Sequence, residues 1–386
     1  MSIKADIFKG PLDPGGQPEI ESPNKLLLGL FAWNVSCGAT ISKAVLADRE
    51  RYRDYWQWPH ASRLVQQAEQ AGFDFEVPFG RYLGHGGEIG FNDEQLDVVV
   101  SAAALSQITE NILLFSTVHV TYAFHPLHFA RFGAQIDYLS NRRWGLNIVT
   151  GWFAEEYAMF SGSLNWLSHD ERYAMADEFV TLMKWLWASK EPIDFQGKYY
   201  RSLGGSVKVK PTRRPRPILV NAGHSEAGID FAAKHCEWLF CTGPDLQALA
   251  EIAVKAKQRA AGYGRRLRLL TSTYSIVADT DAEAEAQFKW IDSQIDEEAT
   301  SRFVGRATQQ PETSFQHGFK ELLRQTALGI TGYWNVGNPD KQAETIRALF
   351  GVGYEGILIT FFDPFRGVQR YGEKVIPRLK QMGLRA

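Results

Sequence analysis

The chain contains few cysteines. Only Cys37, Cys236 and Cys241 are present among 386 residues, and no two of them stand in a C-x-x-C pair. This number is too small for a disulfide framework, so the fold must depend on its apolar core. We therefore expect a protein of the reducing cytoplasm.

Long apolar runs and an excess of one charge are also missing. No apolar run reaches the roughly 20 residues needed to cross a bilayer, and residues 1–25 contain no apolar stretch typical of a secretory signal. The 42 Lys and Arg residues nearly balance the 44 Asp and Glu residues, which leaves a net charge of −2. This balance argues against general binding to nucleic acid or to a membrane surface.

Three histidines, His119, His125 and His128, are close together in the sequence. Their spacings match no familiar metal-ligand motif, and no carboxylate accompanies them. We expect no metal site, and we interpret the three as hydrogen-bonded or solvent-facing side chains.

Apolar runs alternate with helical patterns along most of the chain. Most of the runs are continuous rather than alternating, which is typical of parallel strands covered by helices. The eight runs are Leu26–Trp33, Phe73–Pro78, Ile112–Val118, Trp144–Val149, Pro217–Ala222, Glu237–Thr242, Leu267–Val277 and Gly356–Thr360. Eight strand-then-helix units predict an α/β protein of the (β/α)8 barrel class, with a doubly wound open sheet as the alternative.

Two segments interrupt this rhythm. Residues 188–212 have the pattern of a short hairpin, and residues 294–337 have a weak strand signal. We expect a single barrel domain over residues 26–386, preceded by an extended arm or a disordered tail over residues 1–25. The segment at about 290–337 would be a lid inserted between the seventh and eighth strands, above the face that carries active sites in barrel enzymes.

The segment Asn221–Gly228 (NAGHSEAG) follows an apolar strand and opens a helix. Small residues allow close approach of a ligand, and a helix start offers unpaired N–H groups to a phosphate. Ser225 can add a hydroxyl group, although an ordinary helix cap is an equally simple interpretation. The spacing differs from Walker and dinucleotide loops, and also from the nucleophile elbow of a serine hydrolase.

Three further segments are candidates for a binding site. Asn147 lies inside an apolar strand, where its amide needs partners from a ligand or from neighbouring backbone. Arg81 lies in a glycine-rich loop over residues 78–91, and it can bind an anion or remain in solvent. Residues 167–173 (LSHDERY) form a helix start whose acidic residues suit the helix dipole.

Taken in order, these segments resemble the bacterial luciferase-like superfamily of flavin-dependent monooxygenases. The resemblance extends from about Leu27 to Leu384, and it is strongest in the segments FDF (73–75), GHGG (84–87), NIVTGW (147–152), HDERY (169–173) and AGHSEAG (222–228). The chain looks most like the branch of dimethylsulfone, alkanesulfonate and ring-opening pyrimidine monooxygenases. The segments at 34–38 and 166–179 resemble the sulfone enzyme, and those at 84–91 and 221–233 the pyrimidine enzyme.

The resemblance implies a homodimer or homotetramer that uses O2 and reduced FMN, the latter supplied by a separate NAD(P)H:FMN reductase. Thr117 with Asn147 resembles the catalytic pair that positions oxygen at the flavin nitrogen-5. The residues that match flavin contacts are Gly80, Arg81, Asn147, Glu156, Arg172 and Tyr173, and those that match the phosphate site are Gly223 and Ser225.

The expected substrate is a small organosulfur compound. Alkanesulfonate monooxygenases carry an Arg and a His on the seventh strand, where this chain has Ser272 and Tyr274. Charge for a sulfonate would then come from Arg81 and from Arg302 and Arg306 in the expected lid. We expect oxidation of a sulfone or sulfonate, including a sulfo-sugar, with C–S cleavage. The residues expected near the substrate are Trp33, Asn34, Tyr274, Arg302 and Arg306.

Two other reactions suit the same scaffold. One is flavin-dependent ring-opening oxygenation of a nitrogen heterocycle such as a pyrimidine. The other is a dehydrogenase reaction that uses a flavin or deazaflavin without oxygenation.

Overall fold

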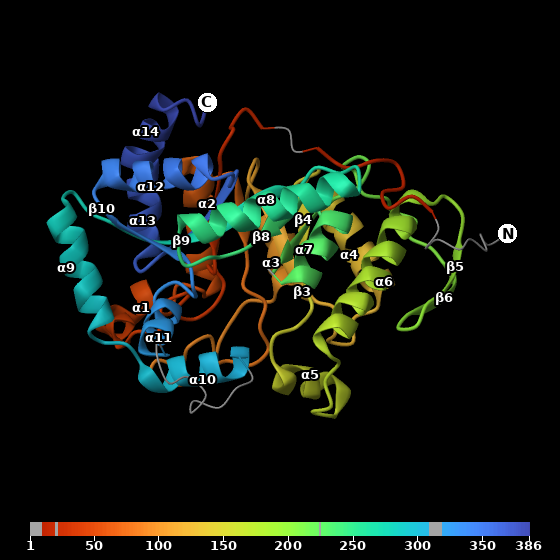
Figure 1. The fold of residues 1–386 in the computed structure, drawn as a ribbon, viewed down its shortest axis with the longest axis horizontal. Coiled ribbons are helices and arrows are strands. Elements are labelled where there is room, and N and C mark those ends of the chain that lie inside the picture. Colours follow the sequence, from red (N-terminus) through yellow and green to blue (C-terminus); the bar gives the residue numbers. More distant parts are fainter. Residues whose placement is uncertain (1–9, 20–21, 224, 309–318) are drawn as a thin grey trace. The chain divides into compact units, whose positions relative to one another are not determined.

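The structure is a computed structural model, and it describes residues 10–19, 22–223, 225–308 and 319–386 (Figure 1). Its large parallel sheet has the strand order β10-β9-β11-β1-β2-β3-β4-β7-β8, and β5 pairs with β6 in a separate hairpin. The strands are β1 (Leu27–Phe31), β2 (Phe75–Val77), β3 (Leu113–His119), β4 (Trp144–Val149), β5 (Ile193–Gln196), β6 (Arg201–Gly205), β7 (Ile218–Ala222), β8 (Trp238–Phe240), β9 (Arg268–Val277), β10 (Tyr333–Gly337) and β11 (Gly356–Phe361).

Eight of these strands follow the order of the chain around the sheet, which makes the fold a (β/α)8 barrel. All eight predicted strands are confirmed, because each predicted run coincides with one of them, and only β3 and β11 extend one residue beyond their runs. The helices are α1 (Arg49–Tyr52), α2 (Trp58–Ala71), α3 (Val98–Leu105), α4 (Pro126–Leu139), α5 (Ala154–Ser161), α6 (His169–Ala188), α7 (Glu226–His235), α8 (Leu246–Gly262), α9 (Asp281–Asp292), α10 (Glu297–Thr308), α11 (Phe319–Ala327), α12 (Pro339–Gly351), α13 (Pro364–Arg370) and α14 (Ile376–Gln381).

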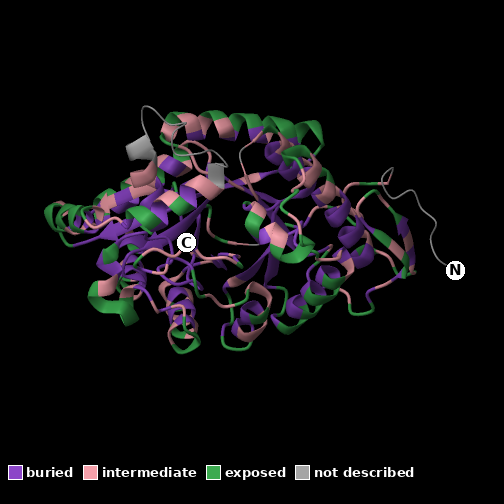
Figure 2. Ribbon diagram, turned by 90° about the horizontal axis from the view of Figure 1, so that it is seen from below, coloured by how far each residue is buried: buried purple, intermediate pink, exposed green. Residues whose placement is uncertain are grey.

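The chain divides into two compact units. Unit 1 comprises residues 1–21, 99–240 and 254–268, and unit 2 comprises residues 22–98, 241–253 and 269–386. In both units the central strands of the parallel sheet are buried and the helices expose one side, as the colours of Figure 2 show. This is the burial pattern of parallel strands covered by amphipathic helices.

Unit 1 contains β3, β4, β7 and β8, which lie side by side in parallel. Helices α4, α6 and α7 pack beside one another, with α4 against β4 and α7 against β7 (Figure 1). The ring of Trp144 on β4 meets that of Trp187 on α6 edge to face at 6.5 Å. Large buried rings thus hold the strands in place, so that polar side chains near the ends of the strands are held on rigid elements.

The predicted hairpin in residues 188–212 is present as β5 and β6. Its turn is held by Glu178 of α6, whose carboxylate accepts hydrogen bonds from the backbone N–H groups of Lys198, Tyr199 and Tyr200. The hairpin is therefore anchored to the helix that starts at the HDERY segment.

Unit 2 contains β1, β2, β9, β10 and β11. The predicted insert between the seventh and eighth strands holds α9 in part, α10 and α11, and ends in β10, which pairs in parallel with β9. No strand was predicted at Tyr333–Gly337 because the strand signal there is weak, and the structure has a strand at this position. This strand lies at the edge of the sheet order and is only partly buried, so it lacks the continuous apolar run of the central strands.

Two helical glycines of unit 1 lead to opposite predictions. A Cβ atom on Gly133 of α4 would collide with the indole ring of buried Trp144, whereas one on Gly262 of α8 would meet nothing within 4 Å. We expect Gly133→Ala to lower the free energy of unfolding by about 1–3 kcal/mol through overpacking. We expect Gly262→Ala to raise it by about 0.5–1 kcal/mol, because Ala restricts the unfolded chain. Urea unfolding of both variants tests this pair, and equal effects would contradict it.

Candidate active site

Thr117 and Asn147 are directly opposite each other in the register of β3 and β4. Both are buried, and Asn147 Nδ2 donates a hydrogen bond to Thr117 Oγ1 over 3.2 Å. Within the described residues Asn147 Oδ1 is buried without a partner. A buried acceptor of this kind lowers the stability of the folded protein unless a ligand donates a hydrogen bond to it. The pair predicted from the sequence is thus brought together, with one acceptor available to a bound N–H group.

A second group of polar side chains surrounds the hydroxyl group of Tyr173 on α6. A Cβ atom on Gly223 or Gly228 would approach this hydroxyl to 2.8 or 2.7 Å, so glycine at both positions leaves room for it. Burial raises the pKa of Tyr173, and the neighbouring Ser225, Thr150 and Asn221 act in the opposite direction. Tyr173, predicted as a flavin contact, therefore lies beside Gly223 and Ser225, which were predicted as the phosphate site.

Ser225 begins α7 as its N-cap, since Ser225 Oγ accepts from Gly228 N over 3.1 Å. The same oxygen lies 3.2 Å from Nε2 of His169. The cap interpretation is therefore correct, and it is compatible with phosphate binding because the first N–H groups of the helix remain available. His224 of the same motif lies outside the described residues.

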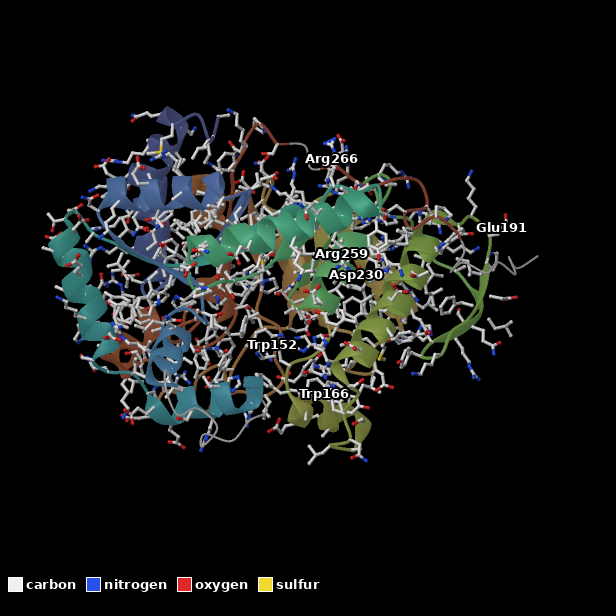
Figure 3. The ribbon with its side chains drawn as sticks, viewed as in Figure 1. Trp152, Trp166, Glu191, Asp230, Arg259 and Arg266 are labelled. Carbon is white, nitrogen blue, oxygen red and sulfur yellow. The ribbon has the colours of Figure 1, made fainter. Side chains whose placement is uncertain are left out.

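Arg172 is half-buried at the start of α6. Its guanidinium group lies 3.8 Å from the ring centre of Trp166, and its Nη1 donates to Leu167 O over 2.9 Å. Burial lowers the pKa of Arg172. Trp166 belongs to the loop between α5 and α6 and is labelled in Figure 3. The orientation of Arg172 is thus set by an aromatic residue that sequence reasoning missed.

Glu156 is fully buried on α5, where its Oε2 accepts a hydrogen bond from the Tyr122 hydroxyl over 2.6 Å. His119 Nδ1 lies 3.8 Å from the same oxygen. The flavin contact expected for Glu156 remains a prediction, because its carboxylate has protein partners in this structure.

Gly80 and Arg81 follow β2 in unit 2. The buried Arg81 lies over the Phe79 ring, at 4.3 Å from its centre, and its backbone N–H donates to Gln95 Oε1 over 3.0 Å. Their role as flavin contacts remains a prediction.

The substrate residues predicted on β9 and after β1 are buried and hydrogen-bonded. The indole of Trp33 donates to Glu76 over 2.6 Å, and the hydroxyl groups of Tyr274 and Thr40 are 2.9 Å apart. The Asn34 amide donates to Phe79 O and Leu96 O and accepts from Phe79 N. Asn34 therefore ties the loops after β1 and β2 together, and a substrate contact would compete with these bonds.

The two predicted lid arginines differ. Arg302 is exposed and pairs with Glu298 on α10, whereas Arg306 donates to Gly84 O over 2.7 Å. His85 lies beside Arg306, and its pKa falls to about 2 through burial and the nearby charges of Arg81 and Arg306. Arg81 and Arg306 thus form a positively charged region within unit 2, and Arg302 is not among the groups acting on His85.

Four residues of unit 1 were not singled out from the sequence, namely Tyr122, Thr150, Trp166 and Asn221. Asn221 had a detectable signal, because it stands in an apolar strand as Asn147 does. It is fully buried, Nδ2 donates to Ile148 O over 2.8 Å, and its side chain also interacts with the Tyr173 hydroxyl. Thr150 and Trp166 lie within segments that carry the family resemblance, but neither was assigned a role, and Tyr122 gave no signal of its own.

These features fit FMN. The start of α7 with Ser225 and the Tyr173 hydroxyl suits a phosphate group, and the Asn147 acceptor suits a ring N–H. Among the residues that the structure describes, no group of three or more His, Cys, Asp or Glu could hold a metal ion. No helix in the described ranges is long and apolar enough to span a membrane.

Comparison with known proteins identifies the family of this chain. A family model described as luciferase-like monooxygenase matches residues 41–356. The pyrimidine monooxygenase RutA of Acinetobacter baylyi is 30% identical over 82% of this chain and 86% of its own. The FMNH2-dependent dimethylsulfone monooxygenase of Pseudomonas fluorescens is 29% identical over 90% of this chain and 94% of its own. The solved structure of a riboflavin lyase with modified FMN and riboflavin superimposes with a TM-score of 0.83 at 24% sequence identity. The superposition covers 94% of this chain and 92% of the lyase chain.

The fold and these two groups of polar residues define a barrel enzyme with a site suited to a phosphorylated, ring-bearing cofactor. The chain belongs to the luciferase-like monooxygenase family. It is a flavin-dependent monooxygenase.

Proposed function

We propose that this protein is the oxygenase of a two-component system, which uses FMNH2 and O2 to oxidise a small organosulfur compound with C–S cleavage. The observation that carries the proposal is the buried Thr117–Asn147 pair, with the unpartnered acceptor Asn147 Oδ1. Such a pair, on rigid neighbouring strands, can hold a ring N–H and a small oxygen molecule in fixed positions.

The residues of unit 1 would hold FMN by its two ends. Ser225, the hydroxyl of Tyr173 and the start of α7 would bind the phosphate, and Asn147 would accept from the ring. When bound, reduced FMN supplies the two electrons that activate oxygen. Buried side chains around Thr117 would exclude water from the reaction.

The supply of the cofactor and the assembly of the protein are parts of the same proposal. The name of the sulfone relative, FMNH2-dependent, describes an enzyme that consumes reduced flavin. We expect a separate NAD(P)H:FMN reductase to deliver it, and we expect a homodimer or homotetramer.

The preference for a sulfone or sulfonate rests on two features. The dimethylsulfone monooxygenase matches 90% of this chain, compared with 82% for the pyrimidine enzyme, at nearly the same identity. The cationic region of Arg81 and Arg306 would also suit a sulfonate oxygen.

Oxygen uptake with FMN, a flavin reductase and NADH tests the function directly. The panel of substrates is dimethylsulfone, methanesulfonate, a sulfo-sugar and uracil. We expect substrate-dependent product from a sulfur compound, with one atom from labelled O2 incorporated. Absence of product with every member, together with failure to bind reduced FMN, would refute the proposal.

The second candidate is ring-opening oxygenation of a pyrimidine, which is favoured by the 30% identity to RutA. The same panel separates the two candidates. A ring-opened product from uracil, with no reaction of the sulfur compounds, would replace the first proposal with the second.

The proposed phosphate contacts lead to a prediction on affinity. Tyr173→Phe and Ser225→Ala each remove one hydroxyl group, and a hydrogen bond to a charged group contributes about 1.5–3 kcal/mol. We expect each variant to raise the Kd of FMN by about tenfold or more, measured by fluorescence quenching. Tyr199→Phe, a partly buried tyrosine in the hairpin turn outside the proposed phosphate site, is the matched control. An unchanged Kd in both variants would place the phosphate elsewhere.

A further inference from the structure

Three side chains meet at the end of β3, and the function proposed above does not use them together. The Tyr122 hydroxyl donates to Glu156 Oε2 over 2.6 Å, and His119 Nδ1 lies 3.8 Å from that oxygen. The rings of His119 and Tyr122 pack with their centres 4.6 Å apart. All three residues are at most 4% exposed.

A carboxylate buried this deeply is costly unless it is hydrogen-bonded and paired with a positive charge. Tyr122 satisfies the hydrogen bond but carries no charge. His119 is a nearby group that can become positive, and a neighbouring carboxylate favours the charged imidazole. The arrangement is thus one in which a histidine can hold a proton inside the protein.

Charged and titratable neighbours limit this effect. In the described part of unit 1, Glu156 on α5 and Tyr122 in the turn after β3 contact the imidazole. Arg172 on α6 acts electrostatically on Tyr122 and would oppose a second positive charge. The pairing with Glu156 must outweigh this repulsion for His119 to be charged near neutral pH.

His119 also shares a strand face with the oxygen site. Side chains of residues i and i+2 of a strand point to the same side, separated by about 7 Å. Thr117, which accepts from Asn147, is therefore on the same face of β3 as His119. The imidazole lies one pleat closer to the end of the strand than the Thr117–Asn147 pair.

We propose that His119 is a proton donor at the oxygen site and that Glu156 and Tyr122 are positioning residues that hold its ring. This inference rests on the proposed function. In a monooxygenation one atom of O2 enters the substrate, and the other leaves as water with two hydrogens and two electrons from the reduced flavin. His119 gives a proton to the departing oxygen and regains one released as the flavin is oxidised. No net proton is consumed.

The first test is a measurement on the protein without flavin. Imidazole nitrogen shifts of labelled histidine are followed by NMR against pH, and His119 is assigned with His119→Gln. We expect its titration midpoint to fall by about one pH unit or more in Glu156→Gln, because the partner charge is lost. Tyr122→Phe should change it less. An unchanged midpoint in Glu156→Gln would overturn the positioning role.

The second test is turnover with the substrate found by the panel. General acid catalysis contributes about 100-fold or more, so His119→Gln should lose at least that factor in kcat. Its Kd for FMN should stay within about threefold. His60→Gln is the matched control, because His60 lies near Glu50 on the surface of unit 2.

The outcomes separate this inference from the proposed function. An active wild-type enzyme with an equally active His119→Gln variant would overturn the inference alone. A wild-type enzyme inactive on the whole panel would refute the proposed function. If His119→Gln does not fold, the kcat of Glu156→Gln tests the inference instead. This variant keeps an acceptor for the Tyr122 hydroxyl, because the Gln amide oxygen can accept the same hydrogen bond. We expect a lower kcat with its pH dependence displaced toward acid, and a wild-type pH profile would overturn the proposal.

Discussion

Replacement of Asn147 by Ala is expected to lower product formation by about 100-fold or more, the effect of removing one preorganised polar group at a reacting centre. The same change should raise the Kd of FMN by no more than about tenfold, because it removes a single neutral hydrogen bond. The difference arises because the phosphate contacts proposed at Ser225 and Tyr173 stay intact. Steady-state kinetics and flavin titration measure the two quantities.

Variants of the partner residue sharpen this experiment. Thr117→Ser keeps the hydroxyl that accepts from Asn147 Nδ2 over 3.2 Å, whereas Thr117→Val removes it at nearly constant volume. We expect the Ser variant to retain most activity and the Val variant to lose it. Asn165→Ala, at an exposed position of the loop before α6, is the control. Wild-type product formation by Asn147→Ala would contradict the oxygen-site assignment.

Replacement of Asp13 by Ala is expected to lower the free energy of unfolding by about 3–5 kcal/mol. Asp13 Oδ1 lies 2.7 Å from both Lys184 Nζ and Arg216 Nη2, and its other oxygen pairs with Arg265. The side chains of Lys184, Arg216 and Arg265 are buried, and the two arginines also pair with the carboxylate of Glu237. Loss of Asp13 would remove the ion pair of buried Lys184 and leave Arg216 and Arg265 to share the carboxylate of Glu237.

Urea unfolding measures this effect. The control is Asp230→Ala, which breaks an exposed pair with Arg259 between α7 and α8 (Figure 3). An exposed pair of this kind contributes at most about 1 kcal/mol. Equal unfolding energies for the two variants would contradict the prediction. A large effect of Asp13→Ala alone would show that the N-terminal segment is part of the folded unit rather than a loose tail.

The accuracy of the sequence predictions varied for physical reasons. The eight barrel strands were predictable because strands covered by helices are buried on both faces and become continuous apolar runs, as in Leu27–Phe31 and Gly356–Phe361. The edge strand β10 was missed because it is partly exposed. Ser225 and Gly223 were recognisable because a strand, small residues and a helix start follow one another directly.

Contacts between distant segments could not be predicted from local patterns. Arg172 was recognised, but its contact with Trp166 depends on how the loop after α5 folds back. Glu156 was expected to contact the flavin by resemblance, and in the structure its carboxylate accepts a hydrogen bond from the Tyr122 hydroxyl. Tyr274 and Asn34 were expected to contact the substrate. In the structure the polar atoms of both side chains form hydrogen bonds with other protein groups.

The sequence by itself determined the strand-and-helix rhythm and the helix start at Ser225, and its resemblance to a known family implied the pairing of Thr117 with Asn147. Each of these depends on neighbours within a few residues, or on the regular register of a parallel sheet. Only the tertiary structure decided that Asn147 has an acceptor to offer, that Asp13 is surrounded by three buried cations and that His119 faces Glu156. Those facts depend on which side chains exclude water from one another, and burial is a property of the folded chain.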